Sequence, residues 1–510
     1  MGSSKPQPSR RSFIAGAAGA AAVALTPGAA LAIPSVVVHP PAPAPTMTTT
    51  SGAPRALAAH CGVLGPPMAD PVVRAEGMQV SVVLTEPADA KCLAWTADDP
   101  SVIFESPWVP SAIGTDPTNP VNVVKFFMPE GAGAAGFTWQ WQVYVALAGT
   151  DPLAPLSAAY GTDDVLRTIP YRPVPGDPTS FSFGVGSCSQ IAPPNQANRK
   201  IASAVSMAAN GLSSFVHLGD TSYVDTWVAI TQDTQAQTYT KFATGLRRHF
   251  LQPDLSALYD GLPMRVVMDD HEAGPDNCYA ANVYPQARQA FTDIAAGTTF
   301  DNALYDLTYP TAPGYDTWVV GQTQFWLLDN RLWRDTPGTK PQSFLGTGYA
   351  SQLGATQRAW LKAGLAASTA TIKIICSPRA FKQFYMAPEQ QELIDWITGI
   401  KSHTPRVSGT VVFLSGDMHA GAVWKLSPTR PVYEMLCGPM FNTTLHSPTG
   451  LSSWQTAWGY QTLFLNTAGG LPGRALSNAW GRVDIGADAS VTLNLMKDDG
   501  TVLYSHTIAA

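Results

Sequence analysis

The chain has 510 residues, a length that predicts two to four domains of roughly 150 residues each. Hydrophobic residues make up 45% of it and charged residues only 13%, against about 25% charged residues in an average soluble protein. Its 14 Trp, 16 Tyr and 19 Phe supply enough large apolar side chains for sizeable cores, which excludes a disordered protein. A net charge of −6 argues against a nucleic-acid-binding surface, since such surfaces are basic.

The first 32 residues have the pattern of an export signal. Arg10 and Arg11 form a twin-arginine pair, a weakly apolar run follows at 14–25, and the Ala-Leu-Ala at 30–32 resembles a cleavage site. The run is too short and too rich in glycine for the roughly 20 apolar residues of a membrane span. We therefore expect a secreted, periplasmic or cell-surface protein, exported by the twin-arginine route and without a transmembrane anchor after cleavage. Cleavage would change the net charge from −6 to −9.

A Pro- and Ala-rich segment at 33–56 is expected to be a semi-extended linker. Residues 57–172 follow with short strand patterns that Gly, Pro and Asp interrupt, and they show no helical periodicity. The strands expected there are 78–84, 91–96, 121–128 and 137–147. This pattern predicts a small N-terminal β-sandwich domain.

From residue 179 to residue 510 the pattern changes to strands alternating with helices, which is typical of a layered α/β domain. Its expected strands are 181–186, 214–218, 264–268, 318–320, 323–328, 372–376 and 410–414. Its expected helices are 199–209, 239–250, 355–367 and 389–401. The chain then returns to β structure, with strands expected at 481–485, 490–496 and 502–508.

The six cysteines are irregularly spaced and include no C-x-x-C pair, which argues against structural zinc. An oxidising compartment permits disulfides, and Cys61 and Cys92 fall in the same N-terminal region, where they could form a bridge. The pairing of the other four cysteines stays open.

Metal-capable side chains follow four of the expected strands, at the point where each strand ends. They are, in chain order, Cys188, Asp220, Tyr223, Asp270, His271, Asp417 and His419. In open α/β sheets, ligands bind just beyond the carboxyl ends of the strands. We therefore expect these side chains to lie close together.

Most of these motifs have an ordinary structural interpretation when taken alone. A Gly-Asp pair after a strand is usually a turn, a buried cysteine is usually a small core residue, and Tyr223 could be a core aromatic. The run Asp269-Asp270-His271-Glu272 is more specific, because three close acids repel one another unless a cation or solvent compensates their charge. Following a buried strand, a divalent or trivalent ion is the natural compensator.

The donor types form two sets. The thiolate of Cys188, the phenolate of Tyr223 and the imidazole of His419 suit a transition metal such as ferric iron. The carboxylates suit a harder cation such as calcium, magnesium or manganese, and Asp220 could bridge both metals. A nucleophilic role for Cys188 is the rival interpretation.

Four motifs, in this order, resemble those of the PhoD-like (alkaline phosphatase D) family of metallophosphoesterases. They are Ser-Cys at 187–188, His-Leu-Gly-Asp with a Tyr three residues on at 217–223, Asp-Asp-His-Glu at 269–272, and Ser-Gly-Asp-x-His at 415–419. The segments 328–331 and 353–361 also resemble this family, so that the resemblance covers roughly residues 60–510. It implies a layered α/β-sandwich metallophosphoesterase domain that follows an N-terminal β domain.

The resemblance implies that Asp220 bridges two metals and that ferric iron is bound by Cys188, Tyr223 and His419. It implies calcium or another divalent cation at the second position. The family often has an acid directly after the tyrosine, whereas here the acid is one position further on, at Asp225.

For the second metal, the resemblance implies Asp270 and Asp417 as ligands. The family often has paired Asn residues after Asp-Asp-His-Glu, whereas this chain has Ala-Gly-Pro-Asp-Asn at 273–277. Asn277 is therefore a candidate for a displaced ligand. Whether Asp269 or Asn277 completes the ligand set of the second metal stays open.

The implied reaction is hydrolysis of phosphomonoesters or phosphodiesters. Two cations neutralise the phosphate charge and lower the pKa of a bound water, so that a metal-bound hydroxide attacks the phosphorus. His271 and Asp220 are the candidate catalytic residues, with His271 as proton donor or transition-state contact. Arg331 and Arg379 could clamp phosphate oxygens, but an ordinary ion-pair or surface position is the interpretation that we favour for each.

Two other functions remain in view. The altered loop at 273–277 is compatible with a degenerate site that binds phosphate or a phospholipid headgroup without turnover. A metal-dependent hydrolase of another kind of ester is the third alternative. The sequence does not decide between monoester and diester substrates.

Overall fold

The structure is a computed structural model. It describes residues 56–64, 77–101, 103–113, 122–128, 131–159, 161–162, 165–191, 199–227, 235–295, 314–336, 350–381, 387–400, 407–442, 461–466 and 478–510. The chain divides into two units, Met1–Val36 and Val37–Ala510, and every described residue belongs to the second. The predicted export signal lies outside the described residues, as does the predicted linker up to its last residue.

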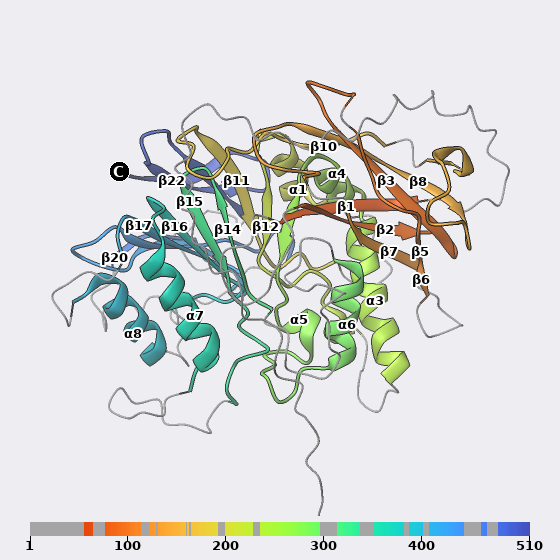
Figure 1. The fold of residues 1–510 in the computed structure, drawn as a ribbon. Helices are drawn as coiled ribbons and strands as arrows, with labels where there is room; N and C mark the ends of the chain where they lie inside the picture. Colours follow the sequence, from red (N-terminus) through yellow and green to blue (C-terminus); the bar gives the residue numbers. More distant parts are fainter. Residues whose placement is uncertain are drawn as a thin grey trace, which may run out of the picture. The chain divides into compact units, whose positions relative to one another are not determined.

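The N-terminal part consists of two antiparallel sheets that share one apolar core (Figure 1). The first sheet has the order β1-β2-β7-β6: β1 Ala56–Leu64, β2 Gly77–Leu84, β7 Asn122–Phe127 and β6 Ala112–Ile113. The second has the order β10-β8-β3-β4, with β5 on β3 and β9 on β8: β10 Arg167–Ile169, β8 Trp139–Leu147, β3 Ala88–Thr96, β4 Ile103–Glu105, β5 Val109–Pro110 and β9 Gly161–Thr162. A short 3-10 helix, η1, spans Leu156–Ala158. This is the expected β-sandwich.

The two N-terminal cysteines are not bridged. Cys61 of β1 and Cys92 of β3 belong to different sheets, and both are buried in the core between them as free thiols. The other four cysteines are also free and buried. The candidate Cys61–Cys92 bridge was therefore wrong.

The α/β part contains two mixed sheets. One has the order β13-β12-β11-β21-β22-β23: β13 Met264–Val266, β12 Phe215–His217, β11 Phe181–Gly186, β21 Ala479–Ile485, β22 Val491–Lys497 and β23 Val502–Ile508. The other has the order β14-β15-β16-β17-β19-β18-β20: β14 Asp316–Val320, β15 Thr323–Leu327, β16 Ile372–Ser377, β17 Thr410–Ser415, β19 Val432–Leu436, β18 Gly421–Lys425 and β20 Gln461–Asn466. β11 to β13 are parallel, as are β15, β16, β17 and β19.

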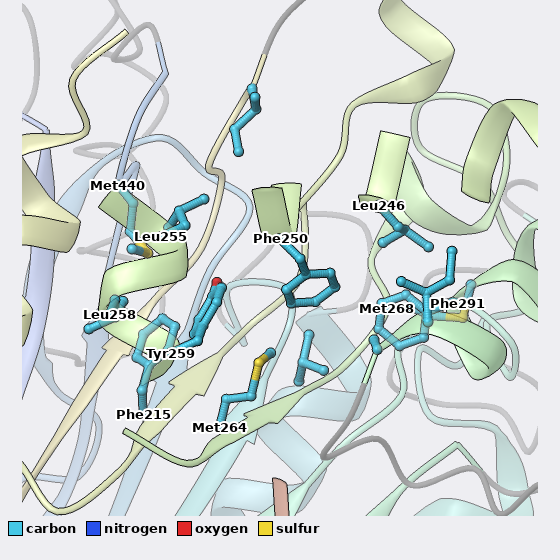
Figure 2. Close-up of a cluster of buried hydrophobic side chains, with 14 of the residues drawn as sticks. Phe215, Leu246, Phe250, Leu255, Leu258, Tyr259, Met264, Met268, Phe291 and Met440 are labelled. Atoms are coloured by element: carbon cyan, nitrogen blue, oxygen red, sulfur yellow. The ribbon is translucent and has the colours of Figure 1, made fainter. Parts of the chain in front are cut away.

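Apolar side chains divide this part into layers. One core, with Phe183 of β11 and Ile374 of β16, lies between the two sheets. A second core covers the other face of the β11 sheet under helices α1, α3, α4 and α6, and Figure 2 shows Phe215, Phe250 and Tyr259 within it. A third core lies under α7 and α8 on the other face of the β16 sheet (Figure 1). The result is a layered α/β sandwich, as expected.

The helices run in chain order through this part. They are α1 Ala202–Ala208, α2 Val224–Trp227, α3 Gln235–Leu251, α4 Pro253–Gly261, α5 Asp270–Ala273, α6 Pro285–Ile294, α7 Gly354–Ala367 and α8 Ala387–Thr398. The sequence analysis anticipated α1, α3, α7 and α8 but not α4 or α6. Both of these helices begin at a proline, which is tolerated in the first turn because that N–H needs no intrahelical partner. Among the described residues, no helix is both long and apolar enough to cross a membrane.

Strand register brings the ends of the strands to the same edge. Gly186, the last residue of β11, lies opposite His217, the last of β12, and His217 lies opposite Val266, the last of β13. In the other sheet, Ser377 of β16 lies opposite Ser415 of β17. The residues that follow these strands therefore leave each sheet at one level.

Candidate metal centre

The structure brings the predicted strand-end residues together into three overlapping groups of potential ligands. Within each group, ligand atoms lie within 4.8 Å of one another. The groups are Cys188, Asp220 and His419; Asp220, Asp270 and His271; and Asp220, Asp269, Asp270 and Asp417. One carboxylate, that of Asp220, belongs to all three and is therefore placed to be shared.

The backbone is strained at these same positions. Seven non-glycine residues of the described chain have a positive φ angle, and six of them are predicted site residues. The six are Cys188, Asp220, Tyr223, Asn277, Asp417 and His419, with φ between 46° and 69°. The left-handed region is unfavourable for most side chains and is retained mainly at functional sites. Five of the six, all but Asn277, follow closely after β11, β12 or β17, so the chain turns sharply where it leaves these strands.

The first group is held by hydrogen bonds around Asp220. The Tyr223 hydroxyl lies 3.2 Å from Asp220 Oδ2 and 2.9 Å from His419 Nε2. Cys188 Sγ lies 3.5 Å from the same Asp220 oxygen. Asn442 Nδ2, 3.2 Å from His419 Nε2, also belongs to this network. Asn442 lies in the coil after β19, and no sequence pattern pointed to it.

Burial dominates the electrostatics of this group. Desolvation, followed by the charges of Asp269 and Asp270, raises the pKa of Asp220 well above its usual value. Burial likewise raises the pKa of Cys188 to about 12 and raises that of Tyr223 well above its usual value. Without a compensating positive charge, a buried thiol and phenol keep their protons.

The third group, Asp220, Asp269, Asp270 and Asp417, contains carboxylates only. Asp220 Oδ1, Asp269 Oδ2 and Asp270 Oδ1 are buried and have no hydrogen-bond partner among the described residues. Asp270 Oδ1 lies 3.2 Å from the Arg331 guanidinium, whereas the structure shows no ion pair for Asp220 Oδ1 or Asp269 Oδ2 among the described residues. A buried carboxylate oxygen of this kind is costly unless a cation neutralises it. The donor set and these orphaned oxygens therefore fit bound metal cations, which would let the carboxylates, the thiol and the phenol ionise.

Glu272, one of the three acids predicted to repel one another, has hydrogen-bond partners of its own. Glu272 does not face the cation groups: its carboxylate accepts hydrogen bonds from the backbone N–H groups of Asp220, at 2.8 Å, Thr221, and Ser222, at 2.9 Å. It also accepts one from Asp269 N at 3.1 Å. Glu272 thus ties together the loops that follow β12 and β13, a role that the sequence analysis missed.

Gly219 makes the close approach of these two loops possible. Its φ is +90°, and a Cβ atom at this position would lie only 2.6 Å from Asp269 Cβ. A side chain would therefore push the Asp220 loop away from the Asp269 loop.

Both arginines singled out in the sequence are buried in ion pairs. Arg331 pairs with Asp269 through Nε, and its Nη2 lies 3.2 Å from Asp270 Oδ1 and 3.3 Å from Asp417 Oδ1. Arg379 Nε lies 3.4 Å from Asp417 Oδ2. The ion-pair interpretation describes both residues, and neither is a surface residue.

Arg331 also changes the protonation of its partners. Burial raises the pKa of Asp269 to about 7 even though Arg331 opposes this. Burial would raise the pKa of Asp270 as well, but Arg331, His271 and Arg379 together hold it below its usual value. The same arginine therefore opposes the effect of burial on two neighbouring carboxylates.

His271 lies at the more open side of the site. Its Nδ1 is 2.7 Å from Asp225 Oδ1, and its ring stacks on that of Tyr223 with centroids 4.0 Å apart. Burial alone would lower its pKa, but the hydrogen bond to Asp225 and the charges of Asp270, Asp225 and Glu272 raise it to about 9. The acid displaced by one position in the sequence, Asp225, therefore still reaches this histidine.

Asn277 contacts the site chiefly through its backbone. Its N–H donates to Asp270 Oδ2 at 2.6 Å. The side chain is exposed, where Nδ2 donates to Asp276 at 3.0 Å and Oδ1 accepts from Arg379 Nη2 at 3.4 Å. A ligand role for the Asn277 side chain stays a prediction.

Comparisons with known proteins identify a family for this chain and solved structures with a similar fold. The family model for PhoD-like phosphatases matches residues 183–462, more than half of the chain. The structure of PhoD aligns with a TM-score of 0.62 at 15% identity, over 91% of this chain and 90% of that chain. Purple acid phosphatase PPD1 from seeds of yellow lupin (Lupinus luteus) aligns with a TM-score of 0.56 at 10% identity, over 90% and 74%. No curated protein matches the chain in sequence. At these identities the structural likeness shows the fold alone.

Proposed function

The chain belongs to the PhoD-like phosphatase family and has the metallophosphoesterase fold, and from its site we propose that it is an exported, metal-dependent hydrolase of phosphomonoesters, phosphodiesters or both. One observation carries the proposal. Carboxylates that follow separate strands meet in a buried group, and three of them, Asp220, Asp269 and Asp270, have oxygens without hydrogen-bond partners among the described residues.

The family implies metal cofactors, and we propose two cations at this site. The softer donors, Cys188, Tyr223 and His419, would hold ferric iron. Asp270 and Asp417 would hold calcium or another divalent cation, and the carboxylate shared by all three groups would contact both metals. Cations bound there would neutralise the charge of a phosphate ester and activate water for attack on phosphorus.

In the proposed reaction, the protein's own side chains donate a proton and orient the histidine that donates it. We propose that His271 donates a proton to the leaving oxygen of the ester. Asp225, 2.7 Å from Nδ1, fixes the ring and favours its protonated form, while the stacked Tyr223 ring restricts its rotation. His271, Asp417 and His419 are the partly exposed members of the three ligand groups, and the side chains of the first two are 11% and 14% exposed, so an ester would approach from their side.

Export is the second element of the proposal. It rests on the twin-arginine pair, the short apolar run and the small-residue cleavage site within residues 1–32. We propose a secreted, periplasmic or cell-surface location. Fractionation of cells that produce the full chain, compared with an Arg10→Lys, Arg11→Lys variant, tests this: the variant should stay in the cytoplasm, and export of both would contradict it.

Turnover of two substrates tests the enzymatic proposal. The full chain should hydrolyse p-nitrophenyl phosphate, bis-p-nitrophenyl phosphate or both, and Asp220→Ala should abolish this. Asp98→Ala, which removes an exposed carboxylate from the N-terminal sandwich, is the matched control and should keep full activity. Unchanged turnover in Asp220→Ala would contradict the mechanism.

A binding protein is the alternative function. It is favoured by the loop 273–277, in which the Asn277 side chain is exposed and bonded to Asp276 and Arg379. A metal-loaded chain that binds inorganic phosphate or a phospholipid headgroup in calorimetry but hydrolyses neither ester would support the alternative. Hydrolysis of carboxylate esters with no turnover of phosphate esters would instead support a different hydrolase.

A further inference from the structure

A guanidinium group lies among the carboxylates that the proposed function assigns to the second cation. Arg331 is fully buried and contacts three of the four members of the acidic group. Its Nε bonds Asp269, and its Nη2 lies 3.2 Å from Asp270 and 3.3 Å from Asp417. An arginine side chain is always charged in proteins, so this group carries one permanent positive charge whatever the pH.

The position of Arg331 is built into the fold. Asp329 Oδ1 accepts the backbone N–H groups of Arg331 and Leu332, both at 2.9 Å. Gln357 of α7 then holds Asp329 itself, accepting its N–H at 2.8 Å and donating to its carbonyl oxygen at 2.7 Å. All four of these residues are buried. These buried hydrogen bonds therefore fix the backbone from which the Arg331 side chain reaches the acids.

Arg331 binds Asp269 through a different atom from the other two acids. Its Nε donates to Asp269 Oδ1, and the Asp269 backbone N–H donates to Glu272, so this residue is held from two sides. Asp270 Oδ2 accepts the N–H of Asn277, whereas Asp270 Oδ1 and Asp417 Oδ1 share the Nη2 of Arg331 at 3.2 and 3.3 Å. Asp269 Oδ2, like Asp270 Oδ1, has no hydrogen bond among the described residues.

We infer that Arg331 is a resident counter-charge of the second cation site, which binds Asp269 through Nε, lowers the contribution of this acid to cation binding and weakens the binding of the cation by the acidic group as a whole. The inference rests on the proposed function, because it concerns the same site. Two positive charges a few ångströms apart repel, so the arginine and the cation oppose each other. In return, the arginine keeps the carboxylates compatible with the folded state when the cation is absent.

Calcium binding to the full chain tests this without reference to ester hydrolysis. The chain is treated with a chelator and titrated with Ca²⁺, and separately with Mn²⁺, by calorimetry, and thermal unfolding is recorded with and without the ion. Arg331→Met should bind Ca²⁺ about tenfold more tightly or better than the wild type. Its unfolding temperature without Ca²⁺ should fall, and the rise on adding Ca²⁺ should exceed that of the wild type. Arg331→Lys keeps the charge and should bind within about threefold of the wild type.

A neighbouring arginine supplies the control. Arg334 is also buried and lies three residues on, but it donates to the carbonyl oxygens of Asn277 and Cys278. Arg334→Met should lose stability without tighter Ca²⁺ binding. Asp269→Asn should bind Ca²⁺ within about tenfold of the wild type, whereas Asp270→Asn should weaken binding by about a hundredfold.

Three results would overturn the inference. The first is weaker Ca²⁺ binding in Arg331→Met, because the arginine would then be positioning ligands. The second is an equal loss of binding in Asp269→Asn and Asp270→Asn, because Asp269 would then be a ligand. The third is absence of Ca²⁺ and Mn²⁺ binding in both the wild type and Arg331→Met, which would also remove the second cation from the proposed function. Ester hydrolysis that fails while the expected Ca²⁺ differences persist would contradict the proposed function alone.

Discussion

The two halves of the site bury their acidic groups in different ways. Around Cys188, Tyr223 and His419 the donors can each carry a proton, and burial raises the pKa values of the thiol and the phenol. Around Asp270 and Asp417 the donors are carboxylates, and guanidinium groups lie against them. A proton is released when a metal binds, whereas a guanidinium stays. A metal at the first half of the proposed site would therefore compete with protons, whereas one at the second half would lie beside a fixed positive charge.

The largest expected effect comes from the residue that the two halves share. Asp220→Asn removes a carboxylate from every group of potential ligands, so both cations should be lost and turnover of p-nitrophenyl phosphate should fall about a thousandfold or more. Metal analysis by mass spectrometry, alongside kinetics, checks this. A variant that keeps one full equivalent of either metal would show that the halves do not depend on a common ligand.

The next largest effect should depend on the leaving group. His271→Asn should lower kcat about a hundredfold for an alkyl phosphate, whose leaving oxygen needs a proton, and less for p-nitrophenyl phosphate, whose leaving group is stable as an anion. Asp225→Asn should act in the same direction with a smaller effect, because it only orients the histidine. Equal losses for both substrates would indicate that His271 contacts the phosphate rather than the leaving group.

Glu272 binds the backbone of loops that carry potential ligands of both halves, so its loss should weaken metal binding at both. Glu272→Gln places an amide donor against backbone N–H donors and should cost about 3 kcal/mol in the free energy of unfolding, measured with urea. Metal content should fall at both positions, and turnover about tenfold. Glu389→Gln is the control, since Glu389 is also buried and accepts the backbone N–H of Gln352, but at the start of α7. Equal metal loss in both variants would mean that general destabilisation explains the effect.

The smallest effect on binding should be confined to one half. Tyr223→Phe should abolish a visible tyrosinate-to-iron charge-transfer band while leaving Ca²⁺ affinity within about threefold of the wild type. An absorption spectrum and a calcium titration of the same sample check this. A colourless wild-type chain without iron would contradict the iron assignment, and a retained band would show that the phenolate is not the ligand.

The local sequence pattern was sufficient to predict the strands whose ends carry the site residues. The buried strands β11, β12, β13 and β17 lie where their apolar runs predicted, and parallel pairing in register brings the residues that follow them to one edge. The two helices that were missed, α4 and α6, begin at Pro253 and Pro285, and proline at a helix start resembles proline in a loop when only neighbours are compared.

Contacts between distant residues could not be predicted in the same way. The run Asp269-Asp270-His271-Glu272 reads as one acidic set, yet Asp269 pairs with Arg331, 62 residues away, and Glu272 with amides about 50 residues away. No periodicity relates these positions, because the fold alone brings them together. The prediction of a cation site was drawn from the repulsion of three acids, and each of them has partners within the protein, although Asp269 Oδ2 has no hydrogen bond among the described residues.

Glu272 also has a consequence for how a substrate can be held. Consecutive backbone N–H groups at a sharp turn form a small concave site in which many phosphate-binding proteins hold their ligand. Here the N–H groups of Asp220, Thr221 and Ser222 converge on an oxygen-bearing group that the chain supplies itself. An incoming phosphate cannot use these three N–H groups. On the proposed mechanism its oxygens would be bound by other groups, the cations among them, so removal of the metal should abolish phosphate binding and its return should restore it.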